Sequence, residues 1–256
     1  MTEKNLTMIM DLYELTMANG IFTSDMRDTV TYFDMFFRRV PDDGGYAIMA
    51  GLEQLIEYMN NLRFEEDDIE YLKNLHLFSD EFIDYLKNFK FTCDVWAVPE
   101  GTVIFPHEPI VTVRGPAMQA LMLETMLLLT INHQSLIATK ANRIVRAANG
   151  RPVMEFGARR AHGYGAAYYG ARAAIIGGCA GTSCLLTAKL FDDEYTAFKT
   201  YAEKYPDSCM LLVDTYNVLK SGIPNAIKVF DDVLKPLGKR PLGIRIDSGD
   251  ITYITK

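Results

Sequence analysis

The sequence predicts a mixed α/β fold with two architectural regions, and two patterns carry this prediction. Residues 91–115 are rich in valine and isoleucine and are punctuated by prolines and glycines, which is typical of short strands joined by turns. Beyond Pro116, helical stretches alternate with short apolar runs, which is typical of β/α units around a parallel sheet. We therefore expect a mixed α+β module over residues 1–115 and part of a β/α barrel over residues 116–256.

Apolar spacing indicates the elements of the first region. The apolar residues of 5–19 recur at helical spacing, so this segment is expected to be one amphipathic helix that ends at Gly20. Residues 29–40 alternate as a strand does, and residues 46–61 and 65–88 have helical patterns.

The run from residue 243 to residue 250 is the most informative part of the chain. As a strand, it places Arg245 and Asp247 on one face and two isoleucines on the other. A turn then follows that contains Ser248, Gly249 and Asp250. Such a strand end suits the binding of hydroxyls or a hydrated metal, although a solvated strand end with an ordinary turn is an equal alternative.

Two other apolar segments also end on charged residues. Residues 210–214 form an apolar run that ends on Asp214, and residues 152–157 form a short strand followed by Arg159 and Arg160. Ligands bind at the C-terminal ends of the strands in parallel sheets, so we expect the three charged strand ends to converge on one rim.

Composition excludes several classes of protein. A net charge of -7 argues against broad nucleic-acid binding. The four cysteines lack Cys-x-x-Cys spacing, which favours reduced, buried thiols over zinc ligands or disulfides. The apolar stretch 117–131 contains Glu124 and is too short to span a bilayer, and no signal peptide precedes Asp11. These features predict a cytoplasmic protein that does not insert into a membrane.

Five segments, in this order along the chain, closely resemble the nicotinate phosphoribosyltransferase family. They are residues 11–18 (Asp-Leu-Tyr-Glu-Leu-Thr-Met-Ala), 155–161 (Glu-Phe-Gly-Ala-Arg-Arg-Ala), 181–183 (Gly-Thr-Ser), 214–216 (Asp-Thr-Tyr) and 245–250 (Arg-Ile-Asp-Ser-Gly-Asp). The resemblance implies an α/β sandwich N-terminal domain plus an irregular β/α barrel, in a homodimer with shared active sites. It also implies that nicotinate and 5-phosphoribosyl 1-diphosphate are joined to give nicotinate mononucleotide and diphosphate, with ATP as co-substrate, in NAD salvage.

A flat pyridine ring requires aromatic faces, and Phe156 and Tyr13 are the candidates. In the family, the tyrosine that matches Tyr13 reaches in from the partner subunit. From periodicity alone, however, Tyr13 lies on the apolar stripe of its helix and reads more readily as a core residue. The carboxylate of nicotinate requires planar donors, so Arg245 is the first choice for binding it, with the Ser183 hydroxyl as an additional donor.

The remaining candidate residues are chosen for the charged groups of the substrates and of the reacting ribose. Asp247 is suited to binding ribose hydroxyls and stabilising a cation-like ribose. Arg159 and Arg160 are candidates for gripping phosphate oxygens, although one of them can equally be a helix-start ion pair. Mg²⁺ would accompany the diphosphate, with Asp250 and Asp214 as candidate carboxylates, although Asp214 can equally orient a neighbouring side chain. By resemblance, Thr182, Ser248 and Gly249 also belong to the substrate site.

The sequence departs from the family in four places. ATP-using members carry a histidine in a Gly-Thr-x-Ala-His-Ser segment, whereas here Phe191 runs directly into Asp192. We therefore expect Phe191 and Asp192 not to be covalent neighbours in the intact protein, and we expect the chain to continue beyond Lys256. His162 stands where glutamine is common, and Cys184 stands where asparagine is usual.

Three other functions remain open. Quinolinate phosphoribosyltransferase would bind two carboxylates and so need a more basic pocket. Nicotinamide phosphoribosyltransferase would favour an aspartate where Ser183 stands. From another class of protein, the chain could be a non-catalytic or degenerate paralogue that binds pyridine nucleotides or a partner protein.

Overall fold

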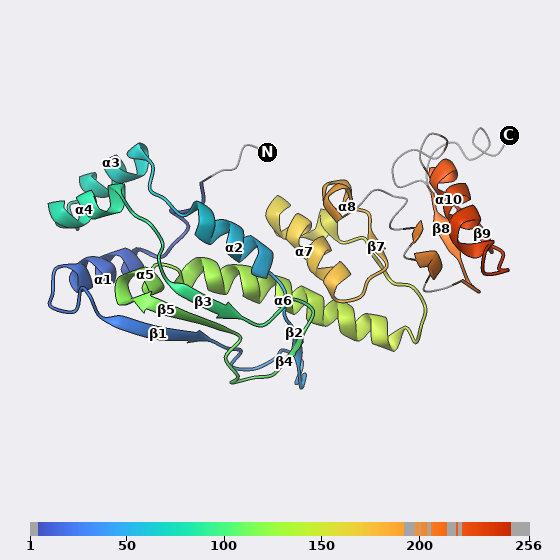
Figure 1. The fold of residues 1–256 in the computed structure, drawn as a ribbon, viewed down its shortest axis with the longest axis horizontal. Coiled ribbons are helices and arrows are strands. Elements are labelled where there is room, and N and C mark those ends of the chain that lie inside the picture. Colours follow the sequence, from blue (N-terminus) through green and yellow to red (C-terminus); the bar gives the residue numbers. More distant parts are fainter. Residues whose placement is uncertain are drawn as a thin grey trace. The chain divides into compact units, whose positions relative to one another are not determined.

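The computed structural model of the chain describes residues 5–191, 198, 199, 201–203, 206–213, 219 and 222–246. It confirms a mixed α/β fold (Figure 1), in which the chain forms two compact units, Met1–Thr139 and Lys140–Lys256. The first unit extends past Gly115 because the helices that follow share one apolar core with the sheet before them. A domain boundary near Gly115 stays a prediction.

A three-stranded antiparallel sheet organises the first unit. Its strands are β1 (Val30–Met35), β5 (Val111–Pro116) and β3 (Asp94–Ala97), with β5 in the centre. Residues alternate between the two faces of the sheet, and Val111 and Val113 of β5 are buried in the core. The opposite face is exposed, and there the Arg114 guanidinium donates to Tyr32 Oη at 3.0 Å and to Asp94 Oδ2 at 2.9 Å.

Helix α1 (Leu12–Phe22) differs from the expected helix over residues 5–19 at both ends. It begins later, because the chain before it is held by side-chain bonds, such as the one that Thr7 Oγ1 accepts from the Arg63 amide at 3.1 Å. It also continues through Gly20 to Phe22, whose buried ring lies 5.4 Å from that of Phe82. Burial of this aromatic ring outweighs the low helix propensity of glycine.

The helical pattern of residues 65–88 is divided into α3 (Glu66–Asn74) and α4 (Asp80–Lys87). The break has a local cause, because the hydroxyl of Ser79 accepts a hydrogen bond from the Phe82 amide at 3.2 Å and caps α4. Two capped helices therefore replace one long one.

The segment 46–61 is only partly helical. Its first part forms β2 (Ala47–Ile48), which pairs with β4 (Val103–Ile104), and α2 (Leu52–Asn61) follows. Gly51 lies between them with a φ of +106°, and the Glu100 carboxylate accepts the Gly51 amide at 2.6 Å. This left-handed turn prevents the helix from starting earlier.

Helix α5 (Ala117–Leu121) and the long helix α6 (Glu124–Ala147) follow the sheet. In the segment around β2, side-chain hydroxyls of α6 accept backbone hydrogen bonds that a neighbouring strand would otherwise accept. The Thr139 hydroxyl accepts the Ile48 amide at 2.8 Å, and the Ser135 hydroxyl accepts the Ala50 amide at 3.0 Å. Buried backbone amides near β2 are thereby paired without a further strand.

The second unit begins with a parallel pair of short strands, β6 (Met154–Glu155) and β7 (Gly181–Thr182). The 3-10 turn η1 (Ala158–Arg160) and α7 (Tyr164–Ile176) connect these strands, and α8 (Leu185–Phe191) follows β7. Helix α7 contacts both strands, so this segment is a β/α/β unit. Asp192 lies outside the described residues, and so does the proposed break in the chain after Phe191.

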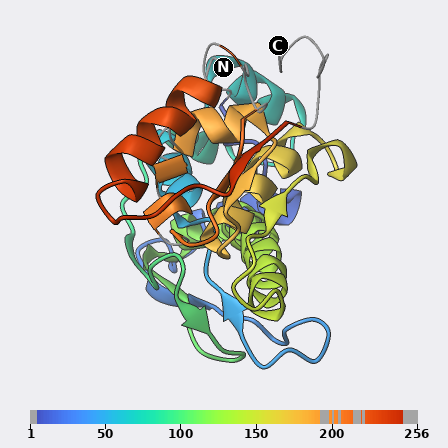
Figure 2. The same cartoon turned by 90° about the vertical axis from the view of Figure 1, so that its right-hand side faces the viewer.

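A second parallel pair joins β8 (Met210–Leu212) and β9 (Gly243–Arg245), with α10 (Ile223–Val229) and the π-helical turn η3 (Phe230–Leu234) between them. Figure 2 shows α10 and η3 running beside this pair. Their shared core includes Cys209, Leu211, Val213 and Leu234. In the described residues the two parallel pairs stay separate and no closed barrel forms, so a common rim for all the strand ends stays a prediction.

The turn at Gly51 generates a prediction about stability. A Cβ there would lie 2.7 Å from the Thr130 carbonyl oxygen, whereas a Cβ at Gly101 meets no atom within 4 Å, although its φ of +81° is also left-handed. Gly101→Ala should lower the free energy of unfolding by about 1 to 2 kcal/mol from the φ alone. Gly51→Ala should lose roughly 1 to 3 kcal/mol more, because it adds the overlap. Urea denaturation measures both, and equal losses would contradict the close approach of Gly51 to α6.

Candidate active site

The end of the β6–β7 pair is built around the carboxylate of Glu155, the last residue of β6. Its Oε2 accepts a hydrogen bond from the Thr182 hydroxyl at 2.6 Å, and its Oε1 accepts one from the Gly157 amide. The Thr182 hydroxyl in turn accepts the Cys184 amide at 3.0 Å. We call Glu155, Gly157, Thr182 and Cys184 the Glu155 cluster, since the one carboxylate ties together the loops that follow two strands.

The Glu155 cluster fixes where the predicted site residues leave the sheet. Glu155 and Thr182 are register partners in a parallel pair, so Phe156 and Ser183 leave neighbouring strands at the same end. The Phe156 side chain is 50% exposed, and Ser183 is also exposed. An aromatic ring and a hydroxyl are thus presented together beside the carboxyl ends of two parallel strands.

Arg159 and Arg160 lie in η1, directly after this loop, and both are exposed. The Arg160 amide donates to the Gly157 carbonyl at 2.8 Å, which closes the turn. The turn is 3-10 and α7 begins only at Tyr164, so both arginines precede the regular helix. The structure therefore brings five predicted residues to one strand end, namely Phe156, Arg159, Arg160, Thr182 and Ser183.

The structure gives Thr182 and Glu155 roles that differ from those suggested by the sequence. Thr182, a predicted substrate residue, is only 6% exposed, and its hydroxyl is engaged by Glu155 and the Cys184 amide. Sequence reasoning gave no role to Glu155. A signal was present, because a carboxylate in a short strand next to a Gly-Thr-Ser turn needs a donor, and threonine supplies one.

Arg245 ends β9, where the Val213 amide donates to the Arg245 carbonyl at 3.0 Å. The Arg245 side chain is exposed and Ile244 is 40% exposed, so the described residues enclose neither face of this strand. In the described part of the chain, Arg245 is thus an exposed residue at a strand end. The other predicted residues of this end lie outside the described residues, namely Asp214, Asp247, Ser248, Gly249 and Asp250.

Tyr13 belongs to the first unit, in the first turn of α1. Its side chain is 42% exposed, so the core reading that periodicity favoured is wrong. A hydrogen bond to Glu124 and partial burial raise the pKa of Tyr13 to about 12. At neutral pH the phenol is therefore protonated, and its ring is available on the surface of this unit.

Other reactive groups do not form a second centre in the described residues. The four cysteines are free thiols, and burial raises the pKa of Cys93, Cys179 and Cys209. Raised values leave little thiolate, which disfavours nucleophilic catalysis by these three. Within the described ranges, no group of three or more histidine, cysteine or acidic residues could hold a metal ion.

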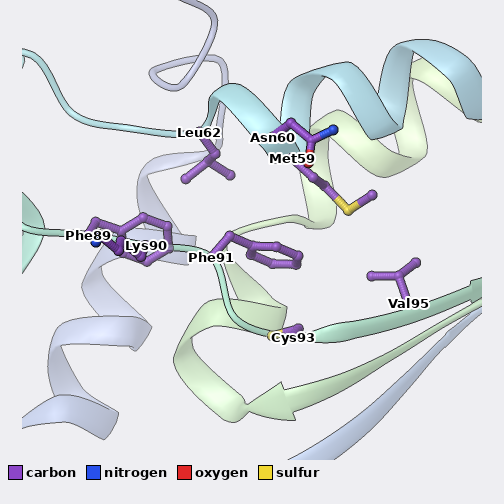
Figure 3. Close-up of a pocket in the computed structure, with 8 residues that line it drawn as sticks. All are labelled: Met59, Asn60, Leu62, Phe89, Lys90, Phe91, Cys93 and Val95. Carbon is purple, nitrogen blue, oxygen red and sulfur yellow. The ribbon is translucent and has the colours of Figure 1, made fainter.

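A pocket of about 420 Å³ opens in the first unit between the end of α2 and β3, as Figure 3 shows. It is lined by Met59, Asn60, Leu62, Phe89, Lys90, Phe91, Cys93 and Val95. None of these residues was predicted for substrate binding, and six of the eight are apolar. No residue of the Glu155 cluster lines this pocket.

Solved structures share this fold. The chain superimposes on human nicotinic acid phosphoribosyltransferase with a TM-score of 0.67 and 27% identity, over 94% of this chain and 61% of that one. Nicotinate-nucleotide pyrophosphorylase from Pyrococcus furiosus has the same fold, with a TM-score of 0.58 and 24% identity over 99% and 62% of the two chains. In its fold, the chain is therefore similar to the type II phosphoribosyltransferases.

Sequence comparison narrows this class. Residues 8–132 match the profile of the nicotinate phosphoribosyltransferase (NAPRTase) N-terminal domain. Nicotinate phosphoribosyltransferases of Mycobacterium tuberculosis and Bacillus subtilis are 44% and 42% identical to the chain, over 96% and 99% of its length. Residues 8–132 therefore belong to the family of nicotinate phosphoribosyltransferase N-terminal domains, and the chain is similar to nicotinate phosphoribosyltransferases over nearly its whole length. It spans about half the length of these curated relatives, 56% and 54%.

The Glu155 cluster predicts that Thr182→Val destabilises the protein although it preserves the shape of the side chain. The substitution leaves Glu155 Oε2 without its donor and the Cys184 amide without its acceptor, which should lower the free energy of unfolding by about 1 to 3 kcal/mol. Thr182→Ser keeps the hydroxyl and is the matched control. Amide hydrogen exchange at Cys184 should quicken in the valine variant only. Equal exchange in both variants would contradict the proposed role of this hydroxyl.

Proposed function

We propose that the protein joins nicotinate to 5-phosphoribosyl 1-diphosphate, giving nicotinate mononucleotide and diphosphate, as a step of NAD salvage. The observation that carries this proposal is 42 to 44% identity to nicotinate phosphoribosyltransferases over nearly the whole chain. The position of Phe156 and Ser183 at the ends of paired parallel strands supports it, because ligands commonly bind there.

The pyridine ring is proposed to stack on Phe156, whose exposed ring offers a face for it. Such stacking contributes about 0.5 to 1.5 kcal/mol beyond area burial. Tyr13 is proposed to cover the other face, from the partner subunit of a homodimer. The nicotinate carboxylate is assigned to Arg245, because a guanidinium offers two parallel donors, and to the Ser183 hydroxyl.

The reaction breaks the bond between the ribose carbon and the diphosphate as the pyridine nitrogen attacks that carbon. Positive character develops on the ribose, and Asp247 is proposed to stabilise it and to bind hydroxyls together with Ser248 and Gly249. The exposed guanidiniums of Arg159 and Arg160 suit the phosphate oxygens. When bound, Mg²⁺ neutralises charge on the diphosphate, and Asp214 and Asp250 are the proposed carboxylates for it.

Several further features belong to the same proposal. The second unit is proposed to be part of an irregular β/α barrel, and the two parallel strand pairs are consistent with this. Exposed apolar residues of α1, Leu12 and Met17, each 52% exposed, support a homodimer with shared sites. ATP hydrolysis is proposed to stimulate the reaction, and the proposed location is the cytoplasm. Among the described helices, none is long and apolar enough to cross a membrane.

The test is diphosphate release by the full-length protein with 5-phosphoribosyl 1-diphosphate and each of nicotinate, nicotinamide and quinolinate in parallel. We expect release with nicotinate, at least tenfold slower release with the other two, and stimulation by ATP. Preference for nicotinamide or quinolinate would show that the protein has a different activity of the superfamily. No release with any acceptor, together with measurable binding of nicotinate mononucleotide, would favour a non-catalytic paralogue.

The assignment of Arg245 predicts a selective loss in Arg245→Lys. An ammonium cannot reproduce the two parallel hydrogen bonds of a guanidinium to a carboxylate, so the KM for nicotinate should rise about tenfold or more. The KM for 5-phosphoribosyl 1-diphosphate should change little. Arg240→Lys, at an exposed arginine in the loop before β9, is the matched control. Steady-state kinetics with each substrate varied in turn measures the effect, and an unchanged nicotinate KM would remove Arg245 from the site.

A further inference from the structure

Glu14, in the first turn of α1, is a fully buried carboxylic acid. Its side chain is 0% exposed, and its Oε1 accepts hydrogen bonds from the Thr125 hydroxyl and from the Thr125 amide, the latter at 3.0 Å. Its Oε2 has no hydrogen-bond partner within the described residues. Burial of an acid in this way costs stability, because water would solvate it better. Its presence therefore calls for a reason other than stability.

Thr125 lies at the start of α6, where the amides of the first turn have no partner within the helix. Glu14 accepts one of these amides and so caps α6 from another helix, a place where the helix dipole favours an acceptor. The same Thr125 hydroxyl accepts the Asp11 amide at 3.3 Å, just before α1. One hydroxyl thus connects Glu14, Asp11 and the start of α6.

The residues that precede Glu14 and Thr125 in the sequence also lie close to each other. Tyr13 precedes Glu14 and Glu124 precedes Thr125, and Glu124 lies close enough to the Tyr13 phenol to raise its pKa. The helix axis of α1 is held elsewhere by apolar contacts of Leu15, Ala18 and Phe22, which are buried in the core. Those contacts secure α1 against the unit, and the Glu14–Thr125 contact adds a polar anchor in the first turn, next to Tyr13.

We propose that Glu14 is a positioning residue, which holds the first turn of α1 on the Thr125 amide and hydroxyl and thereby sets the place of the Tyr13 ring. This inference rests on the proposed function for the catalytic consequence, because Tyr13 is assigned there to the pyridine ring. The geometric part, that the Glu14–Thr125 contact fixes the turn of α1 that carries Tyr13, stands on the first unit alone.

Glu14 needs only its acceptor oxygen for this role. Burial raises the pKa of Glu14, which outweighs the opposing effect of the two Thr125 hydrogen bonds, and Glu124 adds to the rise. The Tyr58 phenol of α2 lies close enough for Glu14 to raise the pKa of that group too. Glutamine also carries one acceptor oxygen and has nearly the same shape, so it should replace Glu14.

The experiment uses the full-length protein with six variants, one of which, Tyr13→Phe, serves only the NMR assignment. Thr125→Val removes the hydroxyl without changing its shape, while Thr125→Ser and Glu14→Gln keep the hydrogen bond to be tested. Thr31→Val is the matched control, because the Thr31 hydroxyl is buried without a partner in the described residues. Tyr13→Ala gives the largest effect that loss of the ring can have. NMR of ¹³C-labelled tyrosine, assigned with Tyr13→Phe, follows the Tyr13 pKa, and kinetics gives kcat and KM for each substrate.

In Thr125→Val we expect the Tyr13 pKa to fall from about 12 toward the ordinary value of about 10. We also expect kcat/KM for nicotinate to fall about tenfold, as small misplacements of a positioned group do. Thr125→Ser, Glu14→Gln and Thr31→Val should retain wild-type values of both. An unchanged Tyr13 pKa in Thr125→Val would overturn the proposal, and so would a loss of activity in Glu14→Gln equal to that in Thr125→Val. If the wild type shows no transferase activity, the proposed function fails, while the tyrosine titration still decides the role of Glu14.

Discussion

The first unit depends on one polar side of helix α6. Along this side, Thr125 holds Glu14, the Thr130 carbonyl approaches Gly51, and the hydroxyls of Ser135 and Thr139 accept the amides around β2. A buried helix usually presents apolar side chains, and hydroxyls are tolerated only where each finds a partner. The segment around β2 supplies these partners. Because the contacts require the two backbones to approach closely, the turn at Gly51 and the start of α2 are determined by α6.

The second unit uses the same solution at the end of a strand pair. Glu155 plays the part that hydroxyls play in the first unit, since its two oxygens collect donors from the loops after β6 and β7. The carboxylate aligns two loops at once, because one oxygen accepts a donor from the loop after β6 and the other accepts the Thr182 hydroxyl of β7. The loops that carry Phe156 and Ser183 are therefore both positioned by Glu155, and a substitution of Thr182 should disturb both loops.

The sequence allowed the class of fold and the family to be predicted, because both rest on long-range patterns. Residues 91–115 do form β3, β4 and β5, and the apolar run at 210 does form β8. Element ends were predicted less well, and the reasons are tertiary. The burial of Phe22 carries α1 through Gly20, and the Ser79 cap divides α3 from α4. Hydrophobic periodicity and helix propensity predict neither of these contacts.

For the candidate site, the sequence indicated which segments contribute residues, but not which residues only hold other residues in place. Tyr13 was read from its spacing as core because periodicity cannot tell a stripe that faces the unit's own core from one that faces outward. Thr182 was grouped with residues that meet substrate, yet its hydroxyl is committed to Glu155. Such assignments depend on hydrogen-bond direction, which appears only when the strands are paired. Glu14 is the same kind of case, an ordinary helix residue in sequence that is completely buried in the structure.

The anchored first turn of α1 has a consequence for molecular recognition at Tyr13. A segment that is flexible in the free protein must give up backbone and side-chain entropy when a ligand or another chain packs on it. Here the backbone that carries Tyr13 is already held by the contacts of Thr125 while 42% of the residue stays accessible. The backbone entropy of this turn is therefore lost during folding rather than during association. A molecule that stacks on Tyr13 meets a ring whose backbone is already ordered.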